Sequence, residues 1–524
     1  MGEFLPKIGQ VSDSSLIKEI LFVLVSFVHG CGVEYMRIIT IFVSVRGLFL
    51  CLPNLEAFHS LKTIMSRQIL FTSVLVLFLL SCGLSSSAIN NPPTEFPTPS
   101  PHSHTNHLET PAITDLPQPA NPTRLLQPDE LIYQGAFLLP PGDAWDYSGY
   151  AMTYFPGGDP DGSEDGFPGS LFVLGHDHQQ MVAEITIPIP VITTDAAALN
   201  TAITLQPFAD ITGGMFGEME IPRAGLAYLP PIGAQSSGKL YFTWGQHFQF
   251  EATPSHGWAE LDLSNPDPAG PWFVGEYTNY VLNDYLFEIP EDWAATYVSG
   301  LRLATGRFRD GRWGGLGPAL FAIAPWLEGN PPTAYTRLNQ VVPLLLYGEN
   351  VPGSPEIDVS QGFQMVGYAE PDEWSGGAWL THDEKSALVF VGTKAMGRTW
   401  YGFSNGVEYP TGSDPNEVYP EVPPWPHDER GWWSEDIQAQ IIFFNPDDLA
   451  AVAQGHMASW EPQPYAVLEL TDFLFSPGFD FENHKHHLMG DVAFDRDNGL
   501  LYLIERRALP KGESVVHVFK IGAR

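Results

Sequence analysis

The sequence predicts an all-β fold, a five-bladed β-propeller, on the basis of three observations. A short strand pattern with a central glycine occurs five times, at Gly149, Gly225, Gly300, Gly376 and Gly490. Each copy is followed by further short apolar segments bounded by turn residues, which is typical of strands repeated in blades. A strand of the last type precedes the first copy, and the last copy lacks one. Pairing of the N-terminal strand with the C-terminal strands would therefore close the ring.

The repeated glycine segments are expected to form the innermost strands, because small residues suit the crowded centre of a propeller. The glycines are 76, 75, 76 and 114 residues apart, so one unit carries about 38 extra residues. We place this insertion at about 400–437, in the fourth blade. The five segments are Ser148–Tyr154, Ala224–Tyr228, Ser299–Ala304, Ser375–Thr381 and Met489–Phe494.

Later strands of each blade are predicted from the apolar segments between the glycines. The predicted second strands are Ser170–His176, Lys239–Gly245, Ala319–Ala324, Ala387–Gly392 and Gly499–Ile504. The predicted third strands are Val182–Ile187, Trp258–Leu263, Ile441–Phe444 and Val515–Ile521. The predicted fourth strands are Ile203–Phe208, Trp272–Tyr277, Phe363–Tyr368 and Tyr465–Leu470, and the strand for the closing blade is Leu131–Leu138. The alternatives are a pair of β-sandwiches and an open repeat array.

The domain boundaries follow from composition. Residues 129–524 form the predicted propeller, and residues 83–128 are rich in Pro, Ser and Thr and predict a disordered tether. Residues 65–82 have the charge, apolar run and terminal cysteine of a secretory signal. Residues 1–64 precede a complete signal, so we interpret them as a mis-assigned start or an extra N-terminal segment.

The end of the signal, Leu79-Leu80-Ser81-Cys82, resembles the lipobox of bacterial lipoproteins. That resemblance implies lipidation of Cys82 and export to the bacterial cell envelope, with the lipid anchor as the sole membrane contact. The alternative is a transmembrane anchor, although the apolar run is short for the roughly 20 residues that span a bilayer. No motif indicates a particular propeller family.

Charge and cysteine content limit the classes of partner. The chain has a formal net charge of −36, and the predicted propeller accounts for most of it, which disfavours nucleic acid and anionic lipid. Its three cysteines, Cys31, Cys51 and Cys82, all precede the propeller, which therefore has no disulfide. The domain also lacks a Gly-x-Ser-x-Gly elbow and a phosphate-binding glycine loop.

A ligand site is expected on the face where the inner strands begin and the second strands end. The loops of this face and the insertion combine Trp, Arg, His and carboxylates, which suits a polyhydroxylated ligand because sugars offer both apolar C–H faces and hydroxyls. The alternative is that the aromatic side chains pack a small core of the insertion. The predicted ligand-binding residues are Arg223, His247, Trp374, Lys394, Arg398, Trp432, Trp433 and His487.

Three carboxylates, Asp146, Glu220 and Glu373, enter this face from three blades. Paired carboxylates can hydrolyse a glycosidic bond, and the chain resembles five-bladed glycosidases in architecture only. The resemblance implies a catalytic role for these three residues. The alternative is that they are ordinary surface acids.

Two parts of the sequence could bind a metal ion, an acidic turn and a group of histidines. The turn containing Asp159, Asp161 and Asp165 resembles the opening of a calcium loop, although it lacks the bidentate Glu at its end, and it lies on the opposite face. Ca²⁺ is therefore a candidate cofactor, and a plain acidic turn is the alternative. Five histidines of neighbouring blades could also bind a transition metal, although no compact metal-binding motif is present: His176, His178, His484, His486 and His487. The alternative is that they are hydrogen-bonded loop histidines.

These features predict a membrane-anchored, extracytoplasmic propeller that binds a polar, carbohydrate-like small molecule or glycan. The alternatives are a glycoside hydrolase and a protein-interaction platform. They differ in what they predict: turnover of glycosides for the hydrolase, and a co-purifying partner for the platform.

Overall fold

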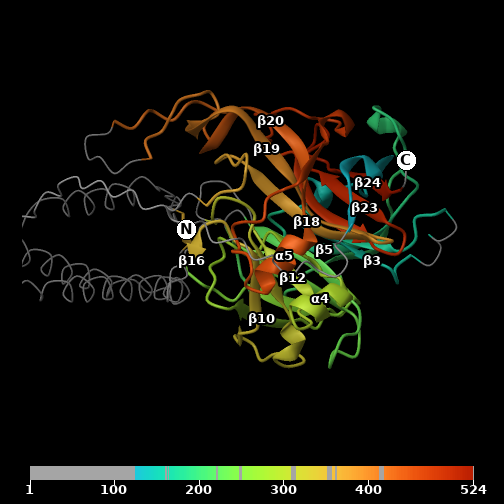
Figure 1. Cartoon of the computed structure of the whole chain (residues 1–524). Helices are drawn as coiled ribbons and strands as arrows, with labels where there is room; N and C mark the ends of the chain where they lie inside the picture. Colours follow the sequence, from blue (N-terminus) through green and yellow to red (C-terminus); the bar gives the residue numbers. More distant parts are fainter. Residues whose placement is uncertain are drawn as a thin grey trace, which may run out of the picture. The chain divides into compact units, whose positions relative to one another are not determined.

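The structure, a computed structural model, describes residues 124–524 apart from short gaps. Five sheets of four or five strands form a ring, which confirms the five-bladed β-propeller (Figure 1). The predicted signal, the Cys82 lipidation site and most of the tether lie outside the described residues. The gaps are 160–161, 163–164, 220–221, 247–248, 250, 308–313, 351–356, 360–362, 412–417 and 523–524.

The first two blades follow the predicted strand order. Blade 1 contains β3 (Met152–Phe155), β4 (Ser170–Leu174), β5 (Val182–Thr186) and β6 (Thr204–Ala209). Blade 2 contains β7 (Arg223–Leu229), β8 (Lys239–Gly245), β9 (His256–Ala259), β10 (Ala269–Val274) and the added β14 (Arg337–Leu338).

Blade 3 is displaced by one strand from the prediction. It contains β11 (Tyr285–Glu288), β12 (Leu303–Gly306), β13 (Leu320–Ile323) and β15 (Val341–Leu345). The predicted inner strand near Gly300 is therefore wrong, and β11 takes that place. Gly300 instead ends helix α4 (Glu291–Tyr297), where its φ is +83° and its N–H donates to the carbonyl of Ala294 over 2.9 Å. A glycine that ends a helix can match the same short sequence pattern as a glycine in a crowded strand.

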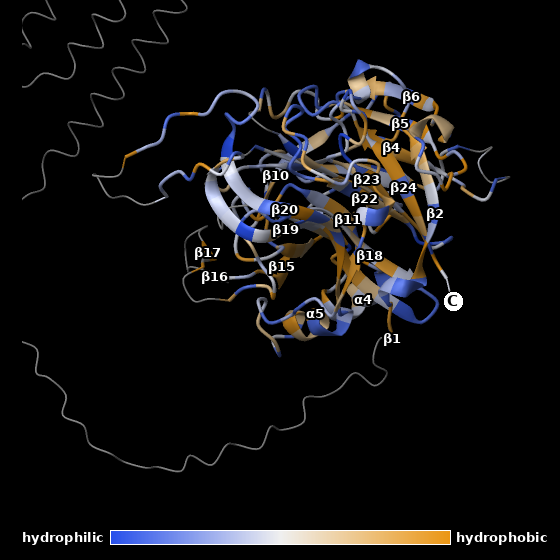
Figure 2. Cartoon of the chain, turned by 90° about the horizontal axis from the view of Figure 1, so that it is seen from above, coloured by the Kyte–Doolittle hydropathy of each residue, from blue (hydrophilic) through white to orange (hydrophobic). Residues whose placement is uncertain are grey.

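Blade 4 contains the insertion as an extension of two strands. Its strands are β18 (Glu373–His382), β19 (Lys385–Phe403), β20 (Arg430–Phe444) and β21 (Ala466–Glu469). The outer parts of β19 and β20 pair from Met396↔Asp436 to Phe403↔Arg430. We call this outer hairpin, residues 395–437, the arm; its hydrophilic colouring contrasts with the apolar blades in Figure 2.

The ring closes in blade 5 as predicted. Strand β2 (Leu131–Leu138) pairs with β24 (Val515–Ile521), which continues through β23 (Leu500–Glu505) to β22 (Met489–Asp495). Tyr133 lies opposite Phe519, and Ala136 lies opposite His517. The Tyr133 hydroxyl and His517 Nδ1 are 3.1 Å apart.

Residues preceding the closing strand also contact the ring. Strand β1 (Arg124–Leu125) pairs in parallel with the start of β19, inside the segment predicted as tether. Leu126 is buried, and its carbonyl accepts a hydrogen bond from Tyr465. The part of the chain that packs against the propeller therefore begins before residue 129, where the sequence had placed the start of the domain.

Glycines let the inner strands approach one another at the centre. The inner strands follow the order β3, β7, β11, β18 and β22 around the ring. A Cβ atom on Gly225 would lie 2.8 Å from the backbone nitrogen of Leu286, and one on Gly376 would lie 2.9 Å from Cα of Asp491. Both glycines are therefore required by close approach of a neighbouring backbone.

In the described part of the chain, helices are few and short. Helix α5 (Pro446–Ala453) begins at Asn445, whose side chain accepts from the backbone N–H of Asp447 over 3.0 Å. Within the described part of the chain, no helix is long and apolar enough to cross a bilayer. The remaining elements are β16 (Glu349–Asn350), β17 (Ile357–Asp358), η2 (Pro128–Glu130), η3 (Asp143–Trp145), η5 (Ala196–Ala198), η6 (Pro325–Leu327) and η7 (Thr471–Phe473).

Candidate functional site

Charged side chains gather where the inner strands begin. Arg223 is the first residue of β7, Glu373 is the first residue of β18, and Asp284 directly precedes β11. In an antiparallel blade, the first strand begins at the edge where the second strand ends, so Arg506, after β23, belongs to the same end. We call this end of the ring the arm face, because the arm extends from the same edge of blade 4.

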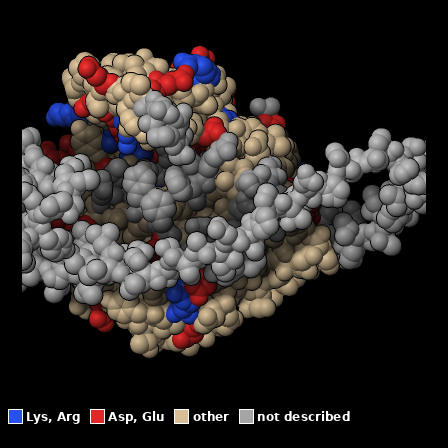
Figure 3. Space-filling view, turned by 90° about the vertical axis from the view of Figure 1, so that its left-hand side faces the viewer, with Lys and Arg blue, Asp and Glu red and all other residues tan. Residues whose placement is uncertain are grey.

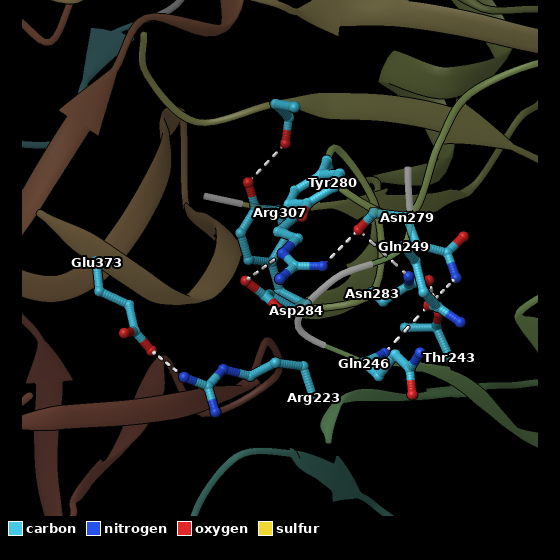
Figure 4. A network of polar contacts seen from close by, with 12 residues as sticks. Arg223, Thr243, Gln246, Gln249, Asn279, Tyr280, Asn283, Asp284, Arg307 and Glu373 are labelled. Atoms are coloured by element: carbon cyan, nitrogen blue, oxygen red, sulfur yellow. Dashed lines mark hydrogen bonds and ion pairs between the residues drawn. The ribbon is translucent and has the colours of Figure 1, made fainter. Parts of the chain in front are cut away.

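An ion-pair chain on the arm face joins three blades. Arg223 Nη2 lies 3.2 Å from Glu373 Oε1, and His487 Nε2 lies 2.8 Å from Glu373 Oε2. Only 4% of Arg223 and 2% of Glu373 is exposed. Figure 4 shows the Arg223 and Glu373 side chains pointing toward one another from separate strands. The predicted residues Arg223, Glu373 and His487 therefore meet in space, although 264 residues separate the first from the last.

A second group of cations surrounds Tyr150. The Arg506 guanidinium lies 3.5 Å from the centre of the Tyr150 ring, and the Arg223 guanidinium lies 4.2 Å from it. The neighbouring Arg507 donates to the carbonyls of Asn483 and His484, which fixes the loop that carries His486 and His487. The His486 and His487 rings are 4.2 Å apart, and burial holds the pKa of His486 well below its usual range.

A separate polar network joins residues of blades 2 and 3. Arg307 Nε lies 3.5 Å from Asp284 Oδ2, and Arg307 Nη1 donates to the carbonyl of Asn279 over 2.6 Å. The Thr243 hydroxyl donates to Asn283 Oδ1 over 2.7 Å. Figure 4 shows these side chains converging from separate segments.

Asp491 is a further buried carboxyl group, on inner strand β22. Its side chain accepts hydrogen bonds of 2.8 Å from the backbone N–H groups of Met152 and Val492. Burial raises the pKa of Asp491 well above its usual range, and the nearby Asp284 raises it further. Asp491 thus links blade 5 to blade 1 beside the ion-pair chain.

The three predicted catalytic carboxylates are not all placed by the structure. Glu373 belongs to the ion-pair chain. Asp146 lies in a loop at the end of η3, and Glu220 lies outside the described residues. A joint catalytic role for the three stays a prediction.

Lys394 and Arg398 are paired with acids on the arm side of blade 4. Lys394 Nζ lies 2.8 Å from Asp372 Oδ1, and Asp372 is fully buried. Burial raises the pKa of Asp372, and the Lys394 ammonium opposes that rise. Arg398 is half exposed and lies 2.8 Å from Glu408.

The predicted aromatic ligand contacts divide into buried and exposed rings. Trp374 is buried in the main core. Trp433 is 5% exposed and packs near Phe479, Phe481 and His486, which joins the arm to the loop of blade 5.

The surface of the arm carries further rings. Trp432 is partly exposed and lies 5.5 Å from Tyr401, centre to centre. Trp425 is 60% exposed and Tyr419 is 57% exposed. The predicted contact His247 lies outside the described residues.

The candidate calcium turn lies between β3 and β4, at the end of the blade opposite the arm face. Asp165 accepts from the backbone N–H of Phe167 over 2.9 Å, and Asp161 lies outside the described residues. Among the residues that the structure describes, no group of three or more His, Cys, Asp or Glu is arranged to hold a metal ion. Calcium binding stays a prediction.

A pocket occupies the opposite mouth of the central channel. It has a volume of 270 Å³ and is lined by residues of the five inner strands and adjacent turns, including Tyr154, Tyr228, Phe287, Trp379 and Phe494. Its carboxylates are largely engaged: Glu288 pairs with Arg302 and lies 3.7 Å from Arg496, and Asp495 accepts from Asn498 over 2.7 Å. Two carboxylates of this pocket, Glu288 and Asp495, are therefore already partnered by neighbouring side chains.

Sequence reasoning missed Asp284, Arg307 and Asp491 as members of the site. The misplaced inner strand of blade 3 hid Asp284, which would otherwise have been recognised as the charged residue entering β11. Asp491 directly follows the repeated glycine Gly490, a position that could have identified it. Arg307 carried no such signal.

On the face shown in Figure 3, the coloured acidic and basic side chains lie in small mixed groups.

Comparison of the sequence with protein-family models and with curated proteins gives no match.

Proposed function

We propose that this protein is a binding protein whose arm face takes a polar, carbohydrate-like ligand. The observation that supports this proposal is that Arg223 and His487, from two other blades, both contact the Glu373 carboxylate at the base of the arm. Convergent, positioned polar groups beside aromatic side chains are typical of sites for small polar molecules.

The arm supports the carbohydrate part of the proposal. Trp425, Tyr419 and Trp432 present ring surface to solvent, whereas Trp433 anchors the arm by packing inward. An exposed ring can stack on the C–H face of a sugar while neighbouring charges bind its hydroxyls. Arg430 lies 4.3 Å from the Tyr409 ring centre and adds a hydrogen-bond donor to this surface.

A glycan array followed by calorimetry on the purified protein tests this proposal. We expect a saccharide to bind, and we expect Trp425→Ala and Trp432→Ala to weaken its affinity about tenfold by removing stacking surface. The control is Tyr335→Ala, which removes a ring that is 67% exposed and lies on blade 2's outer loop, away from the arm. An absence of binding across neutral and acidic saccharides would contradict the proposal.

Hydrolysis is the second candidate, because the carboxylate of Glu373 lies between Arg223 and His487 at the proposed ligand site. Turnover of aryl glycosides that is lost in Glu373→Gln would establish it. The contacts of Glu373 favour binding instead, since Arg223 and His487 already lie against its two oxygens.

We also propose that Cys82 anchors the protein to the envelope through a lipid. The support is the signal-like segment and its lipobox-like end, followed by a proline-rich stretch that would act as a spacer. Incorporation of labelled palmitate into the full chain, and its loss in Cys82→Ala, tests the anchor. Unchanged labelling of Cys82→Ala would contradict it.

A further inference from the structure

Arg506 is held in place at the crossing of two blades. A Cβ atom on Gly490 would lie 3.0 Å from Arg506 Cγ and 2.1 Å from the carbonyl oxygen of Gly149. A Cβ atom on Gly149 would lie 3.1 Å from the same Cγ. Two of the repeated glycines therefore leave room for the aliphatic stem of Arg506, while the Tyr150 ring supports its guanidinium at 3.5 Å.

The Arg506 guanidinium has no anionic partner among the described residues. Only 3% of the residue is exposed, yet no carboxylate in the described part of the chain lies within ion-pair distance of it. Its Nε is buried without a hydrogen-bond acceptor in that same part, whereas its two terminal nitrogens are not among the fully buried polar atoms. A buried guanidinium costs several kcal/mol unless hydrogen bonds or an opposite charge compensate it, so the terminal nitrogens are suited to an incoming anion.

The surroundings of Arg506 are positive although the protein is strongly acidic. Burial lowers the pKa of Arg506; Arg507 and Arg223 lower it further, while Tyr150 and Glu373 oppose the shift. Glu373 already pairs with Arg223 and His487. The local excess of cations attracts an anion, while the overall charge of −36 repels anions elsewhere.

We propose that Arg506, stacked on Tyr150, binds a carboxylate of the ligand, so that the ligand is an acidic saccharide of the uronate type. This deepens the proposed function and rests on it for the saccharide part. The two terminal N–H groups of an arginine match the two oxygens of a carboxylate, and stacking fixes the plane of the guanidinium in advance. A lysine at this position would keep the positive charge but would lose the paired N–H groups and the stacked, planar guanidinium.

The test compares an oligogalacturonate with its neutral methyl ester by calorimetry. We expect the unmodified protein to bind the acid about tenfold or more tightly than the ester. Arg506→Met should bind the two forms equally, and Arg506→Lys should keep only part of the preference. Arg337→Met is the matched control, because Arg337 also lies over an aromatic ring, that of Phe273 at 4.5 Å, but on the outer edge of blade 2.

A second measurement tests the carboxylate subsite without a saccharide. At constant ionic strength, acetate should raise the Tm of the unmodified protein relative to chloride, and Arg506→Met should abolish this shift. If acetate acts in this way but no saccharide binds, the carboxylate subsite stands and the carbohydrate proposal fails. If a saccharide binds but acid and ester bind equally, if Arg506→Met keeps the preference, or if sulfate replaces acetate with a larger shift, the carboxylate assignment is overturned.

Discussion

Glu505→Gln should destabilise the closing blade and the loop beside the candidate site. Glu505 ends β23 and is fully buried. It accepts from the backbone N–H groups of Phe475 and Ser476 at 2.8 Å, and it lies 3.1 Å from His517 Nε2 and 3.6 Å from Lys485 Nζ. The substitution keeps the shape of the side chain and removes its charge.

The loss of unfolding free energy in Glu505→Gln is set by the buried Lys485 ammonium that the substitution leaves behind. The Lys485 side chain is fully buried, so Glu505→Gln leaves its ammonium without the neighbouring negative charge. Breaking a buried ion pair by neutralising one partner costs about 3–5 kcal/mol. Lys485 also donates to the carbonyls of Ser476 and Arg507, so its displacement should loosen the loop that carries His487.

The pH dependence of this effect has a definite sign. Burial raises the pKa of Glu505, but His517 and Lys485 outweigh burial and lower it below its usual range. The stabilisation is therefore fully present above the pKa of a Glu in the unfolded chain, about 4.3, and is lost as the pH falls through the lower folded-state value. The difference between the unmodified protein and Glu505→Gln should shrink in that acidic range.

Urea unfolding followed by tryptophan fluorescence measures the effect, and the matched control is Glu408→Gln. Glu408 lies 2.8 Å from Arg398, but both side chains are more than half exposed, so this pair should contribute about 1 kcal/mol or less. Adding Lys485→Met to Glu505→Gln should recover part of the lost stability. Equal unfolding free energies for Glu505→Gln and Glu408→Gln would refute the reasoning.

Three further tests concern a buried histidine, the crowded centre of the ring and the arm. Burial lowers the pKa of His256 to about 3, so its contribution to stability is present above about pH 6.5 and is lost as the pH falls below that value. The unmodified protein should therefore lose about 2 kcal/mol more than His256→Gln between pH 7 and pH 5, and equal losses in urea titrations would contradict this. Gly376→Ala should cost about 1–3 kcal/mol or more, because its Cβ would meet the β22 backbone. Gly431→Ala, with no atom within 4 Å of its Cβ, should change stability by about 1 kcal/mol or less, and equal unfolding midpoints for the two would argue against strand crowding. Trp433→Ala should cost about 3–5 kcal/mol because the ring is buried between the arm and blade 5, whereas exposed Trp425→Ala should cost about 0.5 kcal/mol or less. The reverse order of their Tm values would show that the arm is anchored elsewhere.

The extent to which the sequence predicted this structure varies from blade to blade. Gly225, Gly376 and Gly490 were recognisable because they recur in the same short strand pattern, and a Cβ atom on each would meet the backbone of a neighbouring blade. In blade 3 the same pattern marked the end of helix α4, while inner strand β11 contains no glycine. A local pattern could not separate these two uses of glycine.

In the candidate site, too, some features were predictable from the sequence and others were not. The sequence by itself determined a closed ring of repeats, the end of the ring at which charged loops meet, and the membership of Arg223, Glu373 and His487. Only the tertiary structure decided that Glu373 lies between Arg223 and His487, that no carboxylate of the described residues lies within ion-pair distance of Arg506, and that Trp433 faces inward. The reason is physical: the strand periodicity and the regular spacing of the glycines can be read along the chain, whereas the pairing of buried charges depends on distances between side chains that only the folded ring brings together.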